Sequence, residues 1–153
     1  MAYPKIVPHW IGGKKCFGKG PAYFEKFAPA TGEKIADVLS GDMLEADIAT
    51  SAARAAYAAW DRLGVFARAK ILRNAAKLIE SKKSQIADVL VLETGRPREN
   101  VLGEIGAVVE CGYFFAGEGA RYFGNTLPSA NPDRLTYYIR ESAGLALLIT
   151  PFN

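Results

Sequence analysis

The chain has 153 residues, of which half are hydrophobic and 23% are charged, and its 19 basic and 16 acidic residues leave a formal net charge of +3. This composition is typical of soluble globular proteins and excludes a disordered chain. The basic residues are scattered, with only Lys14-Lys15 and Lys82-Lys83 as pairs, which argues against a nucleic-acid-binding surface.

Cysteine usage and hydropathy indicate a reducing, non-membrane environment. Cys16 and Cys111 lie far apart, without the paired spacing that zinc sites and disulfide scaffolds use. The first residues lack the apolar core of a signal peptide, and no apolar run approaches the roughly 18 residues that a membrane span needs. We therefore expect a cytoplasmic protein that binds neither membrane nor nucleic acid.

The amino-terminal region favours short strands. Residues 9–17 predict a hairpin, because Gly12-Gly13 can supply the positive φ angles of a two-residue turn. Further strands are predicted at residues 23–27 and 34–39, with a turn at 29–32 between them. The glycine pair lacks the context of a phosphate-binding loop and opens no helix, so the turn is the favoured interpretation.

Three helices are predicted next. Asp42 begins the first, and Glu45 follows three residues later, a variant of the capping box. The second is predicted at residues 67–81 and the third at 84–93, where Gly95 and Pro97 end it. Apolar residues at helical spacing predict the buried faces of the first two helices: Leu44, Ile48, Ala52, Ala55, Ala59 and Leu63 in the first, and Leu72, Ala75, Ala76 and Ile79 in the second.

A fourth helix, predicted at residues 99–123, is unusually rich in glycine. Its predicted buried stripe consists of Leu102, Ile105, Val109, Tyr113 and Ala116. Each glycine in an exposed helix costs about 1 kcal/mol relative to alanine. Two explanations are open, and close packing against a neighbour is favoured over a helix that walls a substrate channel. The glycines concerned are Gly103, Gly106, Gly112, Gly117 and Gly119.

The last part of the chain is predicted to be extended. Residues 125–133, with Pro128 and Pro132, indicate a loop, and the alternation over 135–140 predicts a half-exposed antiparallel strand. An exposed strand edge needs a partner, which a second subunit, a loop or another strand of the same chain could provide.

Residues 145–149 form a continuous apolar run, which predicts a strand covered on both faces, as in parallel sheets. Ligands of open α/β sheets bind beyond the carboxyl ends of such strands, so residues 150–153 are expected to begin a site. Parallel neighbours require crossover connections, and none follows here. The predicted fold class is therefore α/β: an N-terminal β-hairpin region and helices that lead into the first strand of a parallel dinucleotide-binding sheet, incomplete in this chain.

Few side chains are candidates for chemistry. His9 is the only histidine and is predicted to be a surface or edge residue, while Cys111 is predicted to be an inert core thiol and Cys16 a structural one. Asn153 follows the predicted buried strand, and Pro151 fixes the local backbone. A side-chain amide there could donate a hydrogen bond to an oxyanion. The alternative is a solvated asparagine.

Eight segments, in order along the chain, resemble the amino-terminal part of the aldehyde dehydrogenase superfamily, which oxidises aldehydes to acids or acyl thioesters with NAD or NADP. A cysteine of that family attacks the aldehyde, the resulting thiohemiacetal gives hydride to nicotinamide, and a glutamate helps water to release the acyl group. The segments are WIGG (10–13), PATGE (29–33), ARAKIL (67–72), LETGRP (92–97), FFAG (114–117), GNTLP (124–128), RESAG (140–144) and ITPFN (149–153).

The resemblance implies roles for individual residues. Asn153 matches the asparagine whose amide stabilises the thiohemiacetal oxygen. Ile149, Thr150, Pro151 and Phe152 match a segment that contacts the cofactor mainly through its backbone.

Further roles follow from the same resemblance. Ala107 and Cys111 match positions that face the substrate tunnel. Lys26, Phe27 and Glu93 correspond to a monovalent-cation site of some members, with backbone carbonyls from the first two. Strand 135–140, within residues 134–141, matches part of the oligomerisation region, which implies a homodimer or homotetramer.

The sequence also departs from the family. Phe152 stands where many members have tryptophan, and Ser142-Ala143 replaces a commoner proline-bearing pair. The family's nucleophilic cysteine, base glutamate and cofactor-phosphate glycine motif are absent from residues 1–153, so this chain alone is predicted to be inactive. A non-catalytic truncated paralogue that assists assembly is the alternative function. The particular aldehyde and the choice between NAD and NADP are not readable from these residues.

Overall fold

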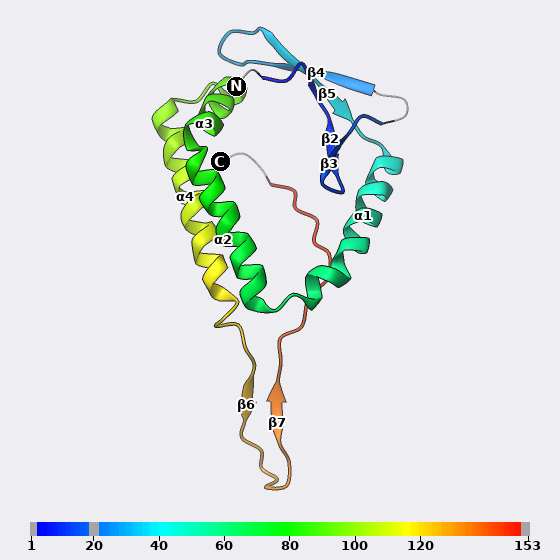
Figure 1. The fold of residues 1–153 in the computed structure, drawn as a ribbon, viewed down its shortest axis with the longest axis vertical. Coiled ribbons are helices and arrows are strands. Elements are labelled where there is room, and N and C mark those ends of the chain that lie inside the picture. The colour runs from blue at the N-terminus through cyan, green and yellow to red at the C-terminus, as the bar shows by residue number, and fades with distance from the viewer. Residues whose placement is uncertain (1–2, 19–21, 151–153) are drawn as a thin grey trace.

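The computed structural model describes residues 3–18 and 22–150, and it combines helices with small sheets (Figure 1). The mixed α/β class is therefore as predicted. The elements in chain order are β1 (Ile6–Val7), β2 (His9–Ile11), β3 (Lys14–Cys16), β4 (Ala22–Phe27), β5 (Lys34–Ser40), α1 (Met43–Arg62), α2 (Val65–Ser81), α3 (Lys83–Thr94), α4 (Arg98–Glu118), β6 (Asn125–Leu127) and β7 (Thr136–Tyr138).

The strands form three small sheets. β5 lies between β1, which is parallel to it, and β4, which is antiparallel. β2 and β3 form the predicted hairpin, and Gly12 and Gly13 have φ angles of 59° and 77°, as a two-residue turn of this type requires. β6 and β7 form a separate two-stranded ribbon that projects from the body (Figure 1).

The helix ends follow the local signals in the sequence. The Leu44 N–H donates to the Asp42 side chain at 2.7 Å, and the Asp42 N–H donates to Glu45 at 3.1 Å, which completes the capping box of α1. Gly95 ends α3 in the left-handed region at φ 68°. A Cβ on Gly95 would lie 3.3 Å from the Pro29 ring, so glycine also lets α3 approach the turn after β4.

Helices α2, α3 and α4 pack together around the main apolar cluster. Ala87 of α3 and Val101 and Ile105 of α4 are almost completely buried there. A Cβ on Gly112 would lie only 2.9 Å from the Cβ of Ala76 in α2. Close packing is therefore confirmed for Gly112, whereas a Cβ on Gly103 would meet nothing within 4 Å.

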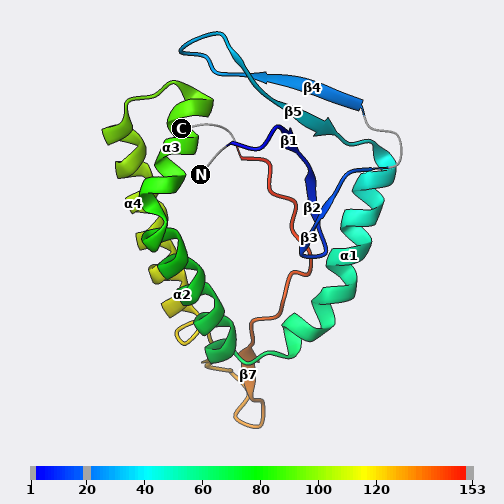
Figure 2. The ribbon, with the colours of Figure 1, turned by 45° about the horizontal axis from the view of Figure 1, so that its top comes forward.

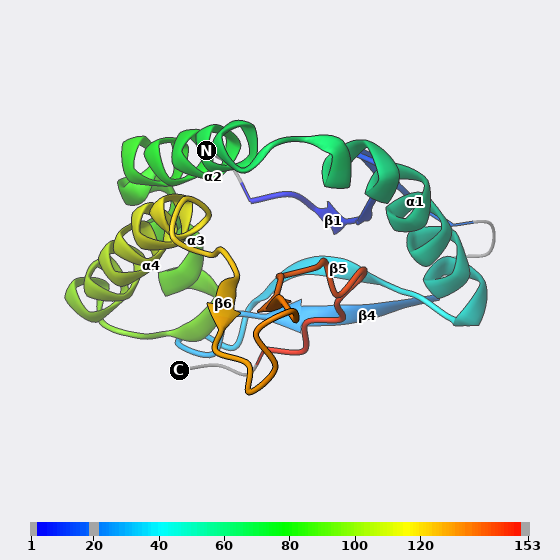
Figure 3. The ribbon, with the colours of Figure 1, turned by 90° about the horizontal axis from the view of Figure 1, so that it is seen from below.

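The predicted buried face of α1 is wrong. None of its residues is buried, and Leu44 and Ile48 are 52% and 48% exposed. α1 lies apart from α2–α4 at the other side of the molecule (Figure 3). Its apolar stripe is real, but β2, which contacts α1, buries none of its residues. Leu72 and Ala75 of α2 are also exposed, while Ala76 is buried as predicted.

The segment after α4 also differs from the prediction. α4 ends at Glu118 instead of reaching residue 123, and residues 125–127 form a strand instead of a loop. Arg140 stacks over the Tyr122 ring at 4.4 Å at the base of the ribbon. A Cβ on Gly124 would lie 1.8 Å from the Tyr138 carbonyl oxygen, so the ribbon requires glycine there. One edge of the predicted strand is thus paired within the chain.

Residues 145–149 do not form the predicted buried strand. The segment is extended and runs from β7 back toward the end of the molecule that carries β4 and β5 (Figures 1 and 2), with Leu147, Leu148 and Ile149 exposed by 85%, 80% and 85%. A buried parallel strand requires hydrogen-bonded neighbours on its edges and cover on its faces. Within the described residues no strand pairs with this segment.

The chain exposes far more surface than a compact monomer of its size. Its accessible surface is 11982 Å², whereas a compact protein of 16.5 kDa has about 7,500 Å². Exposed large apolar side chains lie on α1, on the ribbon and on residues 145–149. None of the helices in the described part of the chain is long and apolar enough to cross a membrane.

Candidate functional site

The residues with the strongest predicted roles lie at the end of the extended segment. Ile149 and Thr150 are exposed, and their backbone forms no strand pair within the described residues. Pro151, Phe152 and Asn153 lie outside the described residues. Their predicted roles, in cofactor contact and in oxyanion stabilisation, therefore remain predictions.

A cavity of about 400 Å³ brings together the three residues predicted for a cation site. Lys26 and Phe27 end β4, and Glu93 lies in the last turn of α3. Pro29, Thr94 and Arg96 complete the lining. The left-handed Gly95 allows α3 to end against the turn that follows β4, so residues almost seventy positions apart in the sequence share one cavity.

Glu93 is held by Tyr3 from the amino-terminal segment. The Tyr3 hydroxyl donates to Oε1 of Glu93 at 2.6 Å. Burial, this hydrogen bond and the negative charge of Glu93 together raise the pKa of Tyr3 to about 12. The phenol therefore remains a protonated donor throughout the physiological pH range.

Two other polar side chains that line this cavity have partners elsewhere, whereas the Lys26 ammonium group, which also lines it, forms no ion pair among the described residues. Arg96 forms an ion pair with Glu104 of α4, and the Thr94 hydroxyl donates to the Leu90 carbonyl at 2.6 Å. Among the described residues, Tyr3 is the one side chain that bonds Glu93. The second oxygen of the carboxylate is thus available to a ligand.

The oxygen atoms of the residues around this cavity include the Glu93 carboxylate and the backbone carbonyls of Lys26 and Phe27. The register of β4 and β5 shifts between Lys26 and Phe27, where Ile35 is the extra residue of a bulge that interrupts the ladder. Hard cations prefer oxygen ligands, such as a carboxylate and the carbonyl oxygens found where the β4–β5 hydrogen-bond ladder is interrupted. Within residues 3–18 and 22–150 no three His, Cys, Asp or Glu side chains are grouped to hold a metal ion.

The two predicted tunnel residues share one face of α4. Ala107 and Cys111 are four positions apart and both are exposed. The prediction of Cys111 as a buried core thiol is therefore wrong. α4 buries Val101, Ile105, Val109 and Ala116 toward its neighbours, which turns residues 107 and 111 outward.

A larger cavity, of about 950 Å³, was not predicted from the sequence. It forms where the end of α1, the start of α2, the end of α4 and the base of the ribbon meet. Phe114 and Phe115 pack edge to face there, with ring centroids 5.2 Å apart. Two of the family-like segments, 114–117 and 140–144, border it, but their sequences gave no sign that they meet. The lining consists of Tyr57, Trp60, Asp61, Val65, Arg68, Phe114, Phe115, Glu118, Gly119, Tyr122, Arg140, Glu141 and Ser142.

His9 and Cys16 take no part in these cavities. His9 is half-buried beside Gly41, and its Nε2 is buried without a hydrogen-bond partner among the described groups. His9 was predicted to be a surface or edge residue, and it does lie at the start of β2. The imidazole ring of His9 is, however, more enclosed than expected. Cys16 is the cross-strand partner of His9, and its sulfur lies 3.8 Å from the Lys14 carbonyl oxygen of the same strand.

Comparison with known proteins gives a consistent result. Residues 18–153 match the sequence profile described as the aldehyde dehydrogenase family. The chain is 33% identical over 144 residues to the non-phosphorylating aspartate-semialdehyde dehydrogenase of Halomonas elongata, covering 94% of this chain and 29% of that protein. It spans between 26% and 31% of the length of the curated relatives it matches.

Solved structures agree with the sequence comparison. An NADP-dependent enzyme of Escherichia coli superimposes with a TM-score of 0.83 at 29% identity, covering 90% of this chain and 28% of that one. Succinate-semialdehyde dehydrogenase of Burkholderia pseudomallei superimposes with a TM-score of 0.81 at 34% identity, covering 84% and 27%. The matched part of each structure is thus a little over a quarter of its chain.

Proposed function

The chain belongs to the aldehyde dehydrogenase family, and on this premise we propose that it forms the amino-terminal part of an enzyme that oxidises an aldehyde with NAD or NADP. The observation that carries the proposal is the family match over residues 18–153, which includes the segment that ends in Asn153. The names of the relatives range from succinate semialdehyde to betaine aldehyde, so the proposal extends to aldehydes as a class.

The chemical contribution of this chain is an amide at residue 153. The attack of a thiolate on an aldehyde carbon places negative charge on the former carbonyl oxygen. The side-chain N–H of Asn153 would donate a hydrogen bond to that oxygen and stabilise the charge as it forms. Donors of this kind act best when the fold fixes them before the reaction begins.

Residues 149–152 would bind the cofactor through their backbone. NAD or NADP, when bound, supplies the nicotinamide that accepts hydride. Ile149 and Thr150 support this role, because their backbone is extended and unpaired within the described residues. Backbone recognition tolerates the phenylalanine at position 152, where many members have tryptophan.

The nucleophile and the base would come from further polypeptide. Cys16 lies in the β2–β3 hairpin and Cys111 on α4, far in sequence from the segment that ends in Asn153. The surface supports a larger assembly, because the excess of about 4,500 Å² over a compact monomer has the size of an extensive permanent interface. The ribbon, with Leu135, Tyr137 and Ile139 each more than 60% exposed, would take part in subunit association.

The cavity between β4 and α3 would hold a monovalent cation. Glu93 would supply the charged ligand, and the carbonyl oxygens of Lys26 and Phe27 would supply neutral ones. Such a cation would fix the end of α3 against the sheet. Its role would therefore be structural.

Substitution of Asn153 in the native protein that carries this sequence tests the central assignment. Asn153→Ala should lower kcat by about 10²–10³, the usual cost of losing one oxyanion donor. Asn153→Asp should do no better, because a carboxylate repels the developing oxyanion. Cofactor affinity should change little, since the segment would hold the cofactor through its backbone.

A purely structural asparagine would give the opposite pattern. If Asn153 only shapes the turn, the melting temperature of Asn153→Ala would fall while kcat of the folded enzyme stayed normal. Measuring kcat, cofactor affinity and melting temperature on the same preparations separates the two roles. A normal kcat in Asn153→Ala would end the oxyanion assignment.

A further inference from the structure

Tyr3 connects the amino-terminal segment to the end of α3 across ninety residues of sequence. Its hydroxyl donates to Oε1 of Glu93 at 2.6 Å. Tyr3 lies just before β1, and the Asp37 N–H of β5 donates to the Lys5 carbonyl at 3.0 Å. β5 also pairs with β4, which ends at Phe27. The sheet that carries Lys26 and Phe27 therefore also anchors the segment of Tyr3, whose hydroxyl reaches Glu93. Figure 2 shows β1, which follows Tyr3, beside β5.

Glu93 would be poorly ordered without this contact. A glutamate side chain has several rotamers, and restricting them costs conformational entropy. Its position in the last turn of α3 also destabilises the ionised side chain, since the partial negative charge at a helix C-terminus repels a carboxylate. Arg96, which could pair with it, is engaged by Glu104. The Tyr3 hydroxyl is thus the described side-chain group that fixes the carboxylate.

We propose that Tyr3 is a positioning residue for the cation site, holding one oxygen of Glu93 so that the other is presented to a monovalent cation beside Lys26 and Phe27. The proposal rests on the cation site proposed above. The bond joins a phenol anchored on the sheet to the carboxylate at the end of α3. The fold makes this bond before a cation arrives. The entropy cost of ordering the Glu93 side chain is therefore met during folding and does not reduce cation affinity.

Thermal unfolding of the native protein provides a readout that does not depend on activity. Melting temperatures would be measured against increasing KCl or NaCl, with tetramethylammonium chloride keeping the ionic strength constant. A cation at concentration c that binds only the folded state raises the free energy of unfolding by RT ln(1 + c/Kd), so the dependence of stability on cation concentration gives the affinity. Tyr3→Phe removes only the hydroxyl. Tyr113→Phe is the matched control, since it removes a phenol that donates to Glu80 at 2.7 Å, away from the cavity.

The expected pattern has three parts. The native protein is stabilised by K⁺ or Na⁺ beyond the effect of tetramethylammonium, and Glu93→Gln abolishes this stabilisation. Tyr3→Phe weakens cation affinity by about tenfold, the change expected on losing a hydrogen bond to a charged group. Tyr113→Phe leaves cation affinity unchanged.

Two other results would overturn the inference in distinguishable ways. If Glu93→Gln abolishes cation binding but Tyr3→Phe binds as tightly as the native protein or more tightly, the cation site stands and the positioning role of Tyr3 is wrong. The phenol would then be a competitor for the carboxylate. If the native protein shows no cation-specific stabilisation, or Glu93→Gln retains it, the cation site itself is wrong, and the role of Tyr3 fails with it.

Discussion

Single side chains decide how closely the helices of this protein approach. Gly112 brings α4 so near to α2 that a Cβ there would lie 2.9 Å from the Cβ of Ala76, whereas Gly103, on the same helix, borders open space. The two glycines have the same intrinsic cost in a helix but different surroundings. Their roles can therefore be separated by one type of substitution.

Gly112→Ala should destabilise the native protein by about 1–3 kcal/mol, because overpacking at the α2–α4 contact exceeds the gain in helix propensity. Gly103→Ala is the matched control and should be neutral or stabilise the protein by up to about 1 kcal/mol. Urea unfolding of both variants measures the difference. Equal changes in the free energy of unfolding for the two substitutions would show that the close approach at Gly112 does not contribute to stability.

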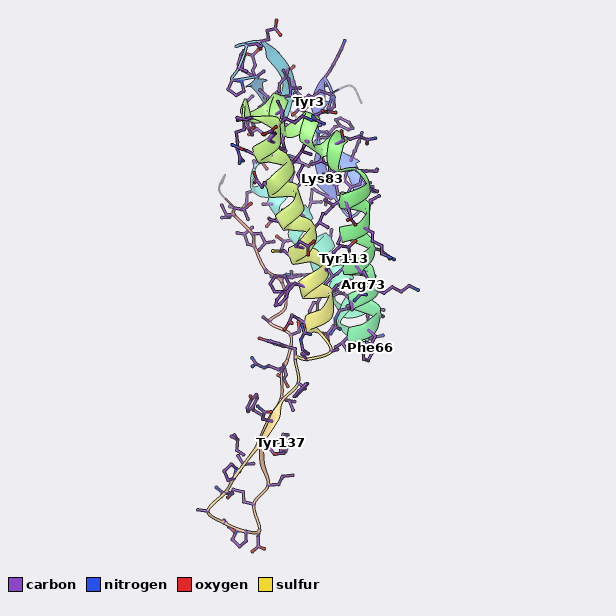
Figure 4. The ribbon with its side chains drawn as sticks, turned by 90° about the vertical axis from the view of Figure 1, so that its left-hand side faces the viewer. Tyr3, Phe66, Arg73, Lys83, Tyr113 and Tyr137 are labelled. Carbon is purple, nitrogen blue, oxygen red and sulfur yellow. The ribbon has the colours of Figure 1, made fainter. Side chains whose placement is uncertain are left out.

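At the scale of elements, α2 and α4 are also joined by a polar contact. The Tyr113 hydroxyl donates to Glu80 at 2.7 Å, on a surface near Arg73 (Figure 4). This hydrogen bond, followed by burial and the charge of Glu80, raises the pKa of Tyr113 above its ordinary value of 10.0. A phenol with a raised pKa in the folded state stabilises the protein only while it remains protonated.

The stability that Tyr113 provides should therefore depend on pH. Below pH 10 the contribution is fully present, and it is lost as the pH rises through the raised pKa of the folded state. The difference in unfolding free energy between the native protein and Tyr113→Phe should be constant from pH 7 to pH 9 and shrink above pH 10. A difference that grew or stayed constant up to pH 11 would contradict this assignment.

The elements also show which features a sequence can predict. Asp42 with Glu45, Gly12-Gly13 and Gly95 were interpreted correctly because each acts on backbone groups within a few residues of itself. The buried face of α1 was predicted wrongly because burial depends on a covering element, and periodicity says nothing about where that element is. β6 was missed because its pairing with β7 depends on a partner about ten residues away, while nearby prolines favoured a loop.

The same distinction applies to the candidate sites. Lys26, Phe27 and Glu93 were grouped through the family resemblance, and the structure places them around one cavity. Tyr3 was not singled out, since a single tyrosine ninety residues from its partner leaves no pattern in the sequence. The larger cavity went unnoticed for a related reason, because Trp60 and Arg140 come from segments that only the folded chain brings together.

At the scale of the whole molecule, the exposed surface is the dominant feature. Residues of α1, the ribbon and the segment 145–149 present apolar side chains to solvent, and the total of 11982 Å² greatly exceeds the value for a compact monomer. Exposed apolar surface of this extent is characteristic of a binding surface. The proposal that the chain is part of a larger assembly would account for this surface, and the chain matches a little over a quarter of each related structure.

The most direct test of the claim that this chain is one part of an aldehyde dehydrogenase is an assay of aldehyde-dependent NADH or NADPH formation. The assay would compare the native protein, its intact mass determined, with the purified 153-residue chain. We predict turnover by the native protein, with an intact mass well above 16.5 kDa, and none by the isolated chain, because we expect the family's nucleophile and base to lie outside residues 1–153. Sustained turnover by the isolated chain that survives both Cys16→Ala and Cys111→Ala would contradict the claim. So would a native protein whose intact mass is only that of residues 1–153.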